Sequence, residues 1–296
     1  MSLHLICLLA CLPAAAEDHA SSGRYPRSDL LIEAAELTEP AAGKKFRIID
    51  VRPLDRYKAG HLPLASTINT TRWSKDFAAD PDQKLWQDRL ANVGINIDTR
   101  VVVYGDDLRD TARIWYIIRY WGVKEVRILN GGWRAWQAAH GKVHQGVYTE
   151  TYFAPVDAKV SPLTGRLAAK DDLLEALKKN IWQIADARSK QEFCGEAGMA
   201  KRKGAIPGAK HLEWSDLLEA KTQRFKKPAE LKKLFADARI DPARPTVTYC
   251  QSGGRAAVLA FALELMGAKE VRNYYRSWAE WGNEDDTPIE KPKSKK

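Results

Sequence analysis

Six consecutive residues near the C-terminal end of the chain, Cys250 through Arg255, combine a thiol, two glycines and a guanidinium. An apolar, β-prone run, Thr246–Tyr249, precedes them, and a helical pattern over 256–266 follows, which Gly267 ends. The pattern predicts that a strand delivers the cysteine to the edge of a sheet. A loop of small residues then leads into a helix.

The loop after the cysteine is suited to hold a negative charge. Its glycines lack a Cβ, so backbone N–H groups can turn toward the sulfur. The positive end of the following helix and the Arg255 guanidinium point at the same place, so a thiol there ionises readily to a nucleophilic thiolate. We interpret Cys250 as that nucleophile, against the alternative of a small buried hydrophobe at the end of a strand. The expected anion-binding residues are Gln251, Ser252, Gly253, Gly254 and Arg255.

The length of the loop separates two chemistries. Loops of the tyrosine-phosphatase type have seven residues from Cys through Arg and enclose a phosphate dianion. Here Cys250 through Arg255 is six residues, a tighter ring that suits one extra sulfur atom. The loop resembles the active-site loop of the rhodanese (sulfurtransferase) family, and a phosphatase is the alternative.

Length and composition limit the possible number of domains and the possible partners. With 296 residues, 45% hydrophobic content and ten tryptophans, the chain has enough apolar material for one large domain or two ordinary ones. A net charge of +9 suits small anionic substrates, but part of it lies in the tail 291–296, and no basic stripe with aromatic residues indicates nucleic-acid binding. Of four cysteines, Cys7 and Cys11 lie at the N-terminus, which leaves Cys194 and Cys250. This number predicts neither a disulfide framework nor a zinc site, and the expected chemistry needs no metal or organic cofactor.

The N-terminal stretch has the composition of a secretory leader. Residues 1–16 contain a short apolar core, then Pro13, then small residues suited to cleavage near Ala16. The core is too short to span a bilayer and lacks a preceding Lys or Arg, and Leu8-Leu9-Ala10-Cys11 is similar to a lipoprotein cleavage box. We expect a signal peptide and export to the periplasm, with a cytoplasmic location if the leader is not functional.

The chain contains the same pattern twice. Val101–Gly105 corresponds to Thr246–Cys250 at an offset of 145 residues, and Lys124-Glu125-Val126-Arg127 recurs letter for letter as Lys269-Glu270-Val271-Arg272. Such a repeat predicts a tandem duplication of an α/β unit with strands alternating with helices around a parallel sheet. The expected segments are domain 1 at 24–146, a linker at 147–163, domain 2 at 164–283 and a charged, disordered tail at 284–296.

Further repeated segments strengthen the family resemblance. Asp50-Val51-Arg52 and the segment 129–136 resemble hallmark segments of rhodanese domains, and the second copy repeats Asp-x-Arg as Asp186-Ala187-Arg188. The resemblance implies two tandem rhodanese domains, each a mainly parallel five-stranded sheet flanked by helices, with catalysis in the second only. The first copy has Gly105, followed by two aspartates, where the second has Cys250. It therefore cannot carry a persulfide.

The expected activity is sulfur transfer. A Cys250 thiolate takes the sulfane sulfur of a small anionic donor, such as thiosulfate or 3-mercaptopyruvate, and passes it to a thiol or cyanide acceptor. Besides the phosphatase, the alternative is a non-catalytic sulfur carrier or sensor that serves a protein acceptor.

Several residues outside the loop are weaker candidates. Asp186 and Arg188 are expected to support the loop more than to contact substrate. Well-known two-domain relatives place a donor-binding arginine just before the Phe that follows Asp-x-Arg, where this chain has Glu192. A nearby basic run either replaces that arginine in binding the donor or is a solvated loop. Cys194 is either a bystander or a resolving thiol, and Arg109 either pairs with Asp106 or Asp110 or reaches the cleft. The basic run consists of Lys201, Arg202 and Lys203.

Overall fold

A computed structural model describes residues 23–38, 43–79, 82–147 and 156–293. The expected signal peptide, residues 148–155 of the expected linker and the end of the tail lie outside these residues. Among the described residues, no helix is both long and apolar enough to cross a membrane.

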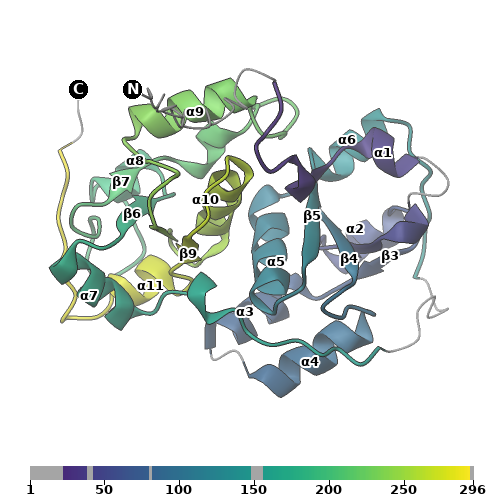
Figure 1. The fold of residues 1–296 in the computed structure, drawn as a ribbon, viewed down its shortest axis with the longest axis horizontal. Helices are drawn as coiled ribbons and strands as arrows, with labels where there is room; N and C mark the ends of the chain where they lie inside the picture. Colours follow the sequence, from purple (N-terminus) through teal and green to yellow (C-terminus); the bar gives the residue numbers. More distant parts are fainter. Residues whose placement is uncertain (1–22, 39–42, 80–81, 148–155, 294–296) are drawn as a thin grey trace, which may run out of the picture.

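The first domain contains one five-stranded sheet with helices on both faces (Figure 1). Its strands are all parallel, in the order β1-β5-β4-β2-β3. They are β1 (Leu31–Ile32), β2 (Arg47–Asp50), β3 (Ala65–Thr67), β4 (Arg100–Tyr104) and β5 (Glu125–Leu129). The α-helices are α1 (Ala34–Thr38), α2 (Leu54–Ala59), α3 (Thr70–Ala79), α4 (Gln83–Asn92), α5 (Leu108–Tyr120) and α6 (Gly132–Ala138). Short 3-10 turns are η2 (Ser28–Leu30) and η3 (Gly43–Lys45).

The second domain repeats this plan. Its parallel sheet has the order β7-β6-β8-β9, formed by β6 (Gln183–Asp186), β7 (Lys210–His211), β8 (Thr246–Tyr249) and β9 (Val271–Asn273). Its α-helices are α7 (Lys170–Lys179), α8 (Lys190–Phe193), α9 (Pro228–Asp237), α10 (Gly254–Leu265) and α11 (Ser277–Trp281). The 3-10 turns are η4 (Thr164–Arg166) and η5 (Trp214–Leu217).

The described part of the second domain has four strands where the sequence predicts five. At the edge where β1 lies beside β5 in the first domain, the second domain forms only an isolated parallel bridge between Leu167 and Asn273. The backbone N–H of Ala168 donates to the Asn273 carbonyl at 3.2 Å. The first domain has only a two-residue strand there, so the copies differ by one residue pair.

Two buried helices join the domains. α10 is apolar on all sides, and α5 is apolar over most of its length, so both are predicted to be covered. They lie side by side at the centre of the molecule (Figure 1), where the Trp115 and Phe261 rings meet edge to face with centroids 4.7 Å apart. This interface brings α5 of the first domain to the helix that follows Cys250.

The segment after Asn283 is ordered as far as the structure describes it. The guanidinium of Arg202 donates to the carbonyls of Trp281 and Thr287 at 3.0 and 2.9 Å and also contacts the Glu284 carbonyl. Glu290 forms an antiparallel bridge with Ala205. The expectation of disorder is therefore wrong for 284–293, because the half-buried Arg202 and a backbone pair hold this charged segment against the second domain.

Candidate active site

Cys250 directly follows β8, as the strand–loop–helix pattern predicts, and is 1% exposed. Gly253 has a φ of +84°, a left-handed conformation that favours glycine, and a Cβ there would lie 2.7 Å from a carbon of the Tyr275 ring. Gly254 begins α10. Glycine is thus required at 253 both by backbone conformation and by the ring packed against it.

Four consecutive loop carbonyls are held by groups outside the loop. The N–H groups of Trp278 and Ala279 donate to the carbonyls of Cys250 and Gln251 at 3.0 and 2.9 Å. Arg113 Nη1 donates to the Ser252 carbonyl at 2.7 Å, and Asn273 Nδ2 donates to that of Gly253 at 3.0 Å. These donors surround the loop and fix the orientation of its peptide groups. The residues carrying the carbonyls are Cys250, Gln251, Ser252 and Gly253.

The orientation of these carbonyls determines where the amides point. In a trans peptide, C=O and the next N–H point in opposite directions, so each carbonyl turned outward turns the following N–H inward. In the described part of the chain, the N–H groups of Gln251, Ser252 and Gly253 donate to no other backbone group. Those of Gly254 and Arg255 belong to the first turn of α10 and have no partner within the helix. The loop therefore presents up to five amide donors to an anion at Cys250.

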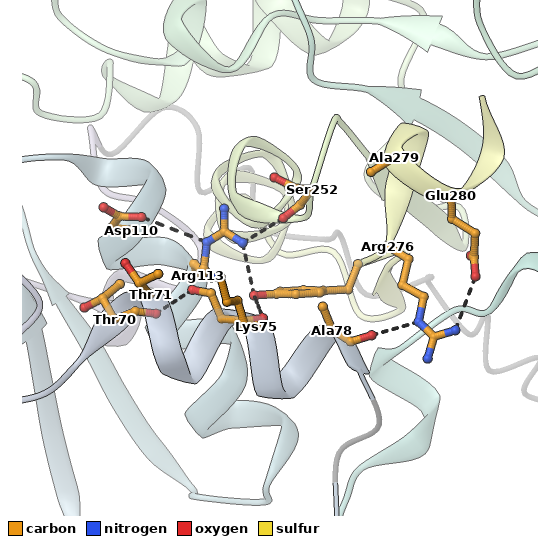
Figure 2. A pocket seen from close by; sticks show the side chains of 12 residues that line it. Thr70, Thr71, Lys75, Ala78, Asp110, Arg113, Ser252, Arg276, Ala279 and Glu280 are labelled. Carbon is orange, nitrogen blue, oxygen red and sulfur yellow. Dashed lines mark hydrogen bonds and ion pairs between the residues drawn. The ribbon is translucent and has the colours of Figure 1, made fainter. Parts of the chain in front are cut away.

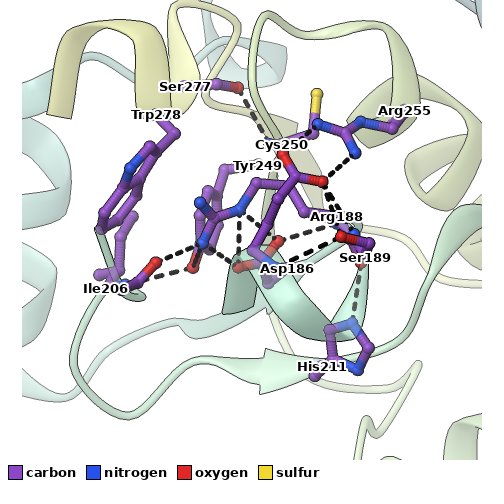
Figure 3. Close-up of polar contacts among 12 residues, drawn as sticks. Asp186, Arg188, Ser189, Ile206, His211, Tyr249, Cys250, Arg255, Ser277 and Trp278 are labelled. Carbon is purple, nitrogen blue, oxygen red and sulfur yellow. Dashed lines mark hydrogen bonds and ion pairs between the residues drawn. The ribbon is translucent and has the colours of Figure 1, made fainter. Parts of the chain in front are cut away.

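The cysteine backbone is fixed by a serine that carries strain. The Cys250 N–H donates to Ser277 Oγ at 3.1 Å, and this hydroxyl donates in turn to the Tyr274 carbonyl at 2.6 Å. Ser277 is buried and has a φ of +55°, unusual for a residue with a Cβ. Figure 3 shows Ser277 directed at the backbone of Cys250.

Arg255 lies beside Cys250, as predicted, but its guanidinium is bound by a carboxylate (Figure 3). Its Nη1 and Nη2 donate to the two oxygens of Glu192 at 2.6 and 2.8 Å. Burial alone lowers the pKa of Arg255, and the interactions with Glu192 and Cys250 outweigh it, so its pKa is raised. The glutamate that departs from the family pattern thus neutralises the arginine of the loop.

The Asp186–Arg188 pair has a structural role. Arg188 Nη2 lies 2.6 Å from Asp186 Oδ2 and donates to the Gly204 carbonyl at 2.7 Å, and the arginine is 1% exposed. The guanidinium also lies over the Trp278 ring, 4.3 Å from its centroid. The first domain repeats this arrangement with Asp50 and Arg52 at 2.6 Å. Because the copy without the cysteine has the same pair, its role is to hold the fold around the loop.

The other weaker candidates lie in structural positions. In the basic run, Lys201 and Lys203 are exposed, and Arg202 binds the C-terminal segment. The hypothesis that the run binds the sulfur donor is therefore not supported for Arg202. Cys194 is a buried free thiol packed with Phe193 and Ala205.

Arg109 pairs with Asp107 at 2.5 Å rather than with either aspartate expected. Its guanidinium lies 5.3 Å from the centroid of the Trp214 ring, across the domain boundary.

A pocket of about 530 Å³ opens between the domains beside the loop (Figure 2). The first domain contributes Lys75 and Arg113, and the second contributes Ser252, Tyr275 and Arg276. No sequence motif identifies Arg113 as a site residue, because its partners Ser252 and Tyr275 lie in the other copy. Tyr275 and Ser277 belong to the segment 275–278, the counterpart in the second copy of part of 129–136, but that repeat assigns neither residue a role.

Among the described residues, no group of three or more His, Cys, Asp or Glu side chains is placed to hold a metal ion. The donors around Cys250 are amides and guanidinium groups, which suit an anion.

Comparisons with known proteins agree with this geometry. The model of the rhodanese-like domain matches residues 33–139 and 169–284. A thiosulfate sulfurtransferase of Corynebacterium glutamicum is 37% identical over 286 residues, which cover 90% of this chain and 92% of the relative. The sulfur carrier protein TtuD of Thermus thermophilus is 31% identical, with 90% and 98% covered, and a 3-mercaptopyruvate sulfurtransferase of Escherichia coli is 29% identical, with 79% and 84% covered.

Solved structures show the same fold. The anaerobic ergothioneine biosynthesis enzyme of Chlorobium limicola superposes with a TM-score of 0.82 at 23% identity, covering 92% of this chain and 72% of that one. Because the family model matches both halves of the chain and the relatives cover most of it, the chain belongs to the rhodanese family and contains two tandem rhodanese-like domains.

Proposed function

We propose that the protein is a sulfurtransferase that moves a sulfane sulfur from a small anionic donor to a thiol or cyanide through a persulfide on Cys250. The observation that carries the proposal is the loop whose four carbonyls are bound from outside, so that its amides face the cysteine. The relatives named thiosulfate and 3-mercaptopyruvate sulfurtransferases support these two compounds as donors.

The first half-reaction loads the sulfur. The Cys250 thiolate attacks the outer sulfur of thiosulfate and forms a new S–S bond, while the bond between the outer sulfur and the sulfonate sulfur breaks. Sulfite leaves with that electron pair, and the enzyme keeps one negative charge on the terminal sulfur of the persulfide. The loop amides then stabilise this terminal sulfur, as an oxyanion hole stabilises a developing negative charge.

The second half-reaction unloads it. Cyanide or a thiolate attacks the terminal sulfur, the S–S bond to Cys250 breaks, and its electrons return to the cysteine as a thiolate. With cyanide the product is thiocyanate. Sulfur exchange of this kind needs neither a metal nor an organic cofactor.

The experiment follows the sulfur on the intact chain. Thiosulfate alone is expected to add one sulfur atom to the peptide that contains Cys250, and cyanide is expected to remove it. Cys250→Ser loses both steps, whereas Cys194→Ser, at the other buried thiol, keeps them. If Cys250→Ser still converted thiosulfate and cyanide into thiocyanate, the proposal would be wrong.

A second candidate is a sulfur carrier, which the relative named as a sulfur carrier protein favours. A carrier accepts sulfur at Cys250 but releases it slowly to small thiols and cyanide. The rate of unloading by cyanide, compared with that by a protein thiol, separates the two functions. Hydrolysis of an aryl phosphate would instead indicate the phosphatase alternative.

We further infer that residues 1–16 direct export to the periplasm, supported by their apolar core and the small residues before Glu17. N-terminal sequencing of the protein from a periplasmic extract tests this inference. Full-length, uncleaved protein found only in the cytoplasm would contradict it.

A further inference from the structure

Arg113 belongs to α5 of the first domain, yet its guanidinium binds the active-site loop of the second. Its Nη1 donates to the Ser252 carbonyl at 2.7 Å and to the Tyr275 hydroxyl at 3.1 Å. Figure 2 shows the guanidinium between the Ser252 backbone and Asp110. Among the four loop carbonyls described above, that of Ser252 is the one held by the first domain.

The bond to Ser252 controls a specific amide. The Ser252 carbonyl and the Gly253 N–H belong to one peptide plane, so holding the carbonyl outward aims that N–H inward. The other three carbonyls are held by Trp278, Ala279 and Asn273, all within the second domain. Without Arg113, the peptide between Ser252 and Gly253 is free to turn and withdraw a donor from the sulfur.

The charge of Arg113 is only partly balanced by nearby protein groups. Its side chain is 15% exposed, and the closest carboxylate oxygen, on Asp110, lies 4.0 Å from Nε. This Nε is buried and has no hydrogen-bond partner in the described part of the chain. A buried cation with so few partners is costly unless another anion lies nearby.

The guanidinium also lies against the start of α10. A Cβ on Gly254 would lie 2.4 Å from Arg113 Nη2, so glycine is what permits this approach. The N-terminus of α10 is itself positive, and Arg255 follows directly. Because Glu192 balances the charge of Arg255, Arg113 and the N-terminus of α10 are the positive groups here without a close carboxylate, and an anionic sulfur on Cys250 stabilises them.

The pKa of Arg113 also reflects a negative charge on Cys250. Burial alone lowers the pKa of Arg113, but Tyr275, the charge on Cys250 and Asp110 outweigh burial and raise it. The guanidinium and a negative sulfur on Cys250 therefore attract one another.

We propose that Arg113 is a positioning residue of the active site: it holds the catalytic loop in its anion-binding conformation and balances the charge of the sulfur on Cys250. This inference rests on the proposed sulfur transfer. It gives the copy without a cysteine a function, because the second domain cannot complete its own loop without this side chain.

The test compares Arg113→Met and Arg113→Lys with Arg109→Met in the full-length chain. Arg109 is a matched control on the same helix and near the same interface, but its side chain is 49% exposed and pairs with Asp107. Three quantities are measured for each variant: kcat/KM for thiosulfate, the rate at which iodoacetamide alkylates the Cys250 peptide between pH 5 and 9, and the free energy of unfolding in urea.

Arg113→Met is expected to lower kcat/KM at least about tenfold, because a charge-assisted hydrogen bond and a buried charge are lost. Its alkylation profile is expected to move to higher pH, because the thiolate loses a neighbouring cation. Arg113→Lys restores the position of the profile but only part of kcat/KM, since lysine keeps the charge without the planar fork. Arg109→Met stays within about twofold of the parent protein.

An unchanged alkylation profile in Arg113→Met would overturn the proposal, even if stability fell, because a merely structural arginine has no effect on the profile. An equal loss in Arg109→Met would also overturn it. The proposed function is tested separately by the sulfur added to Cys250 at saturating thiosulfate. If the proposed sulfur transfer is correct, both the parent protein and Arg113→Met gain this sulfur. If the proposed function is wrong, the parent protein itself gains none.

Discussion

Replacing Glu192 with Gln tests how the charge of the loop arginine is balanced. The carboxylate accepts both hydrogen bonds of the Arg255 fork and also caps α8 through Ser189. Burial alone raises the pKa of Glu192, but Arg255 and Ser189 outweigh it and lower the pKa from its usual 4.5 to about 2. Glutamine has nearly the shape of a protonated glutamate, so the substitution imitates protonation at neutral pH.

The pKa shift gives the size of the effect. Each pKa unit corresponds to about 1.4 kcal/mol, so the ionised carboxylate contributes about 3 kcal/mol to the free energy of unfolding at pH 7. The two side chains are only 19% and 16% exposed, so screening by solvent removes little of it. Because the pKa is lower in the folded state, the contribution is complete above about pH 4.5 and disappears as the pH falls toward 2.

The assay is urea unfolding of the parent protein and Glu192→Gln at pH 7, 5 and 3. We expect the difference in free energy of unfolding to be largest at pH 7 and to shrink at pH 3. Glu175→Gln, which removes an exposed pair with Lys179 on α7, is the control and is expected to leave unfolding unchanged. A difference below about 1 kcal/mol at pH 7, or one that does not depend on pH, would refute the reasoning.

Three further substitutions test other parts of the structure. Gly253 has a φ of +84° and lies against Tyr275, so Gly253→Ala is expected to lower the free energy of unfolding by about 1–3 kcal/mol and to slow persulfide formation. If the variant unfolds and forms the persulfide as the parent protein does, the described loop conformation is wrong. Asp186→Asn leaves Arg188 buried with half its ion pair, so calorimetry should show a loss of about 3–5 kcal/mol, and a neutral result would argue against the pair as a support. Lys201→Ala is expected to leave the KM for thiosulfate unchanged, whereas a severalfold increase would bring the basic run back as a donor site.

The sequence alone predicts the parts of the site that are local. The strand, Cys250, the two glycines and the start of α10 follow one another within nine residues, and local patterns of apolar and small residues identify them. The duplication and the position of Gly105 in the first copy likewise follow from the chain compared with itself. Both features depend on neighbours in sequence or on a fixed offset.

The contacts that the sequence does not predict are long-range ones between polar side chains. Arg113 meets Ser252 across 139 positions, and Glu192 meets Arg255 across 63. The charge of the tail predicts disorder, yet Arg202 holds the tail through backbone carbonyls, which every residue has. An arginine that binds carbonyl groups leaves no pattern in the partner sequence.

The central claim is that the sulfur in transit is bonded to Cys250, and labelled thiosulfate tests it most directly. Thiosulfate with a radioactive outer sulfur is given to the full-length protein, the excess is removed, and the peptide containing Cys250 is isolated before and after cyanide is added. We predict that the label is on this peptide, that cyanide releases it quantitatively as thiocyanate, and that Cys250→Ser carries none. Labelled thiocyanate formed while the Cys250 peptide never carries label would contradict the account.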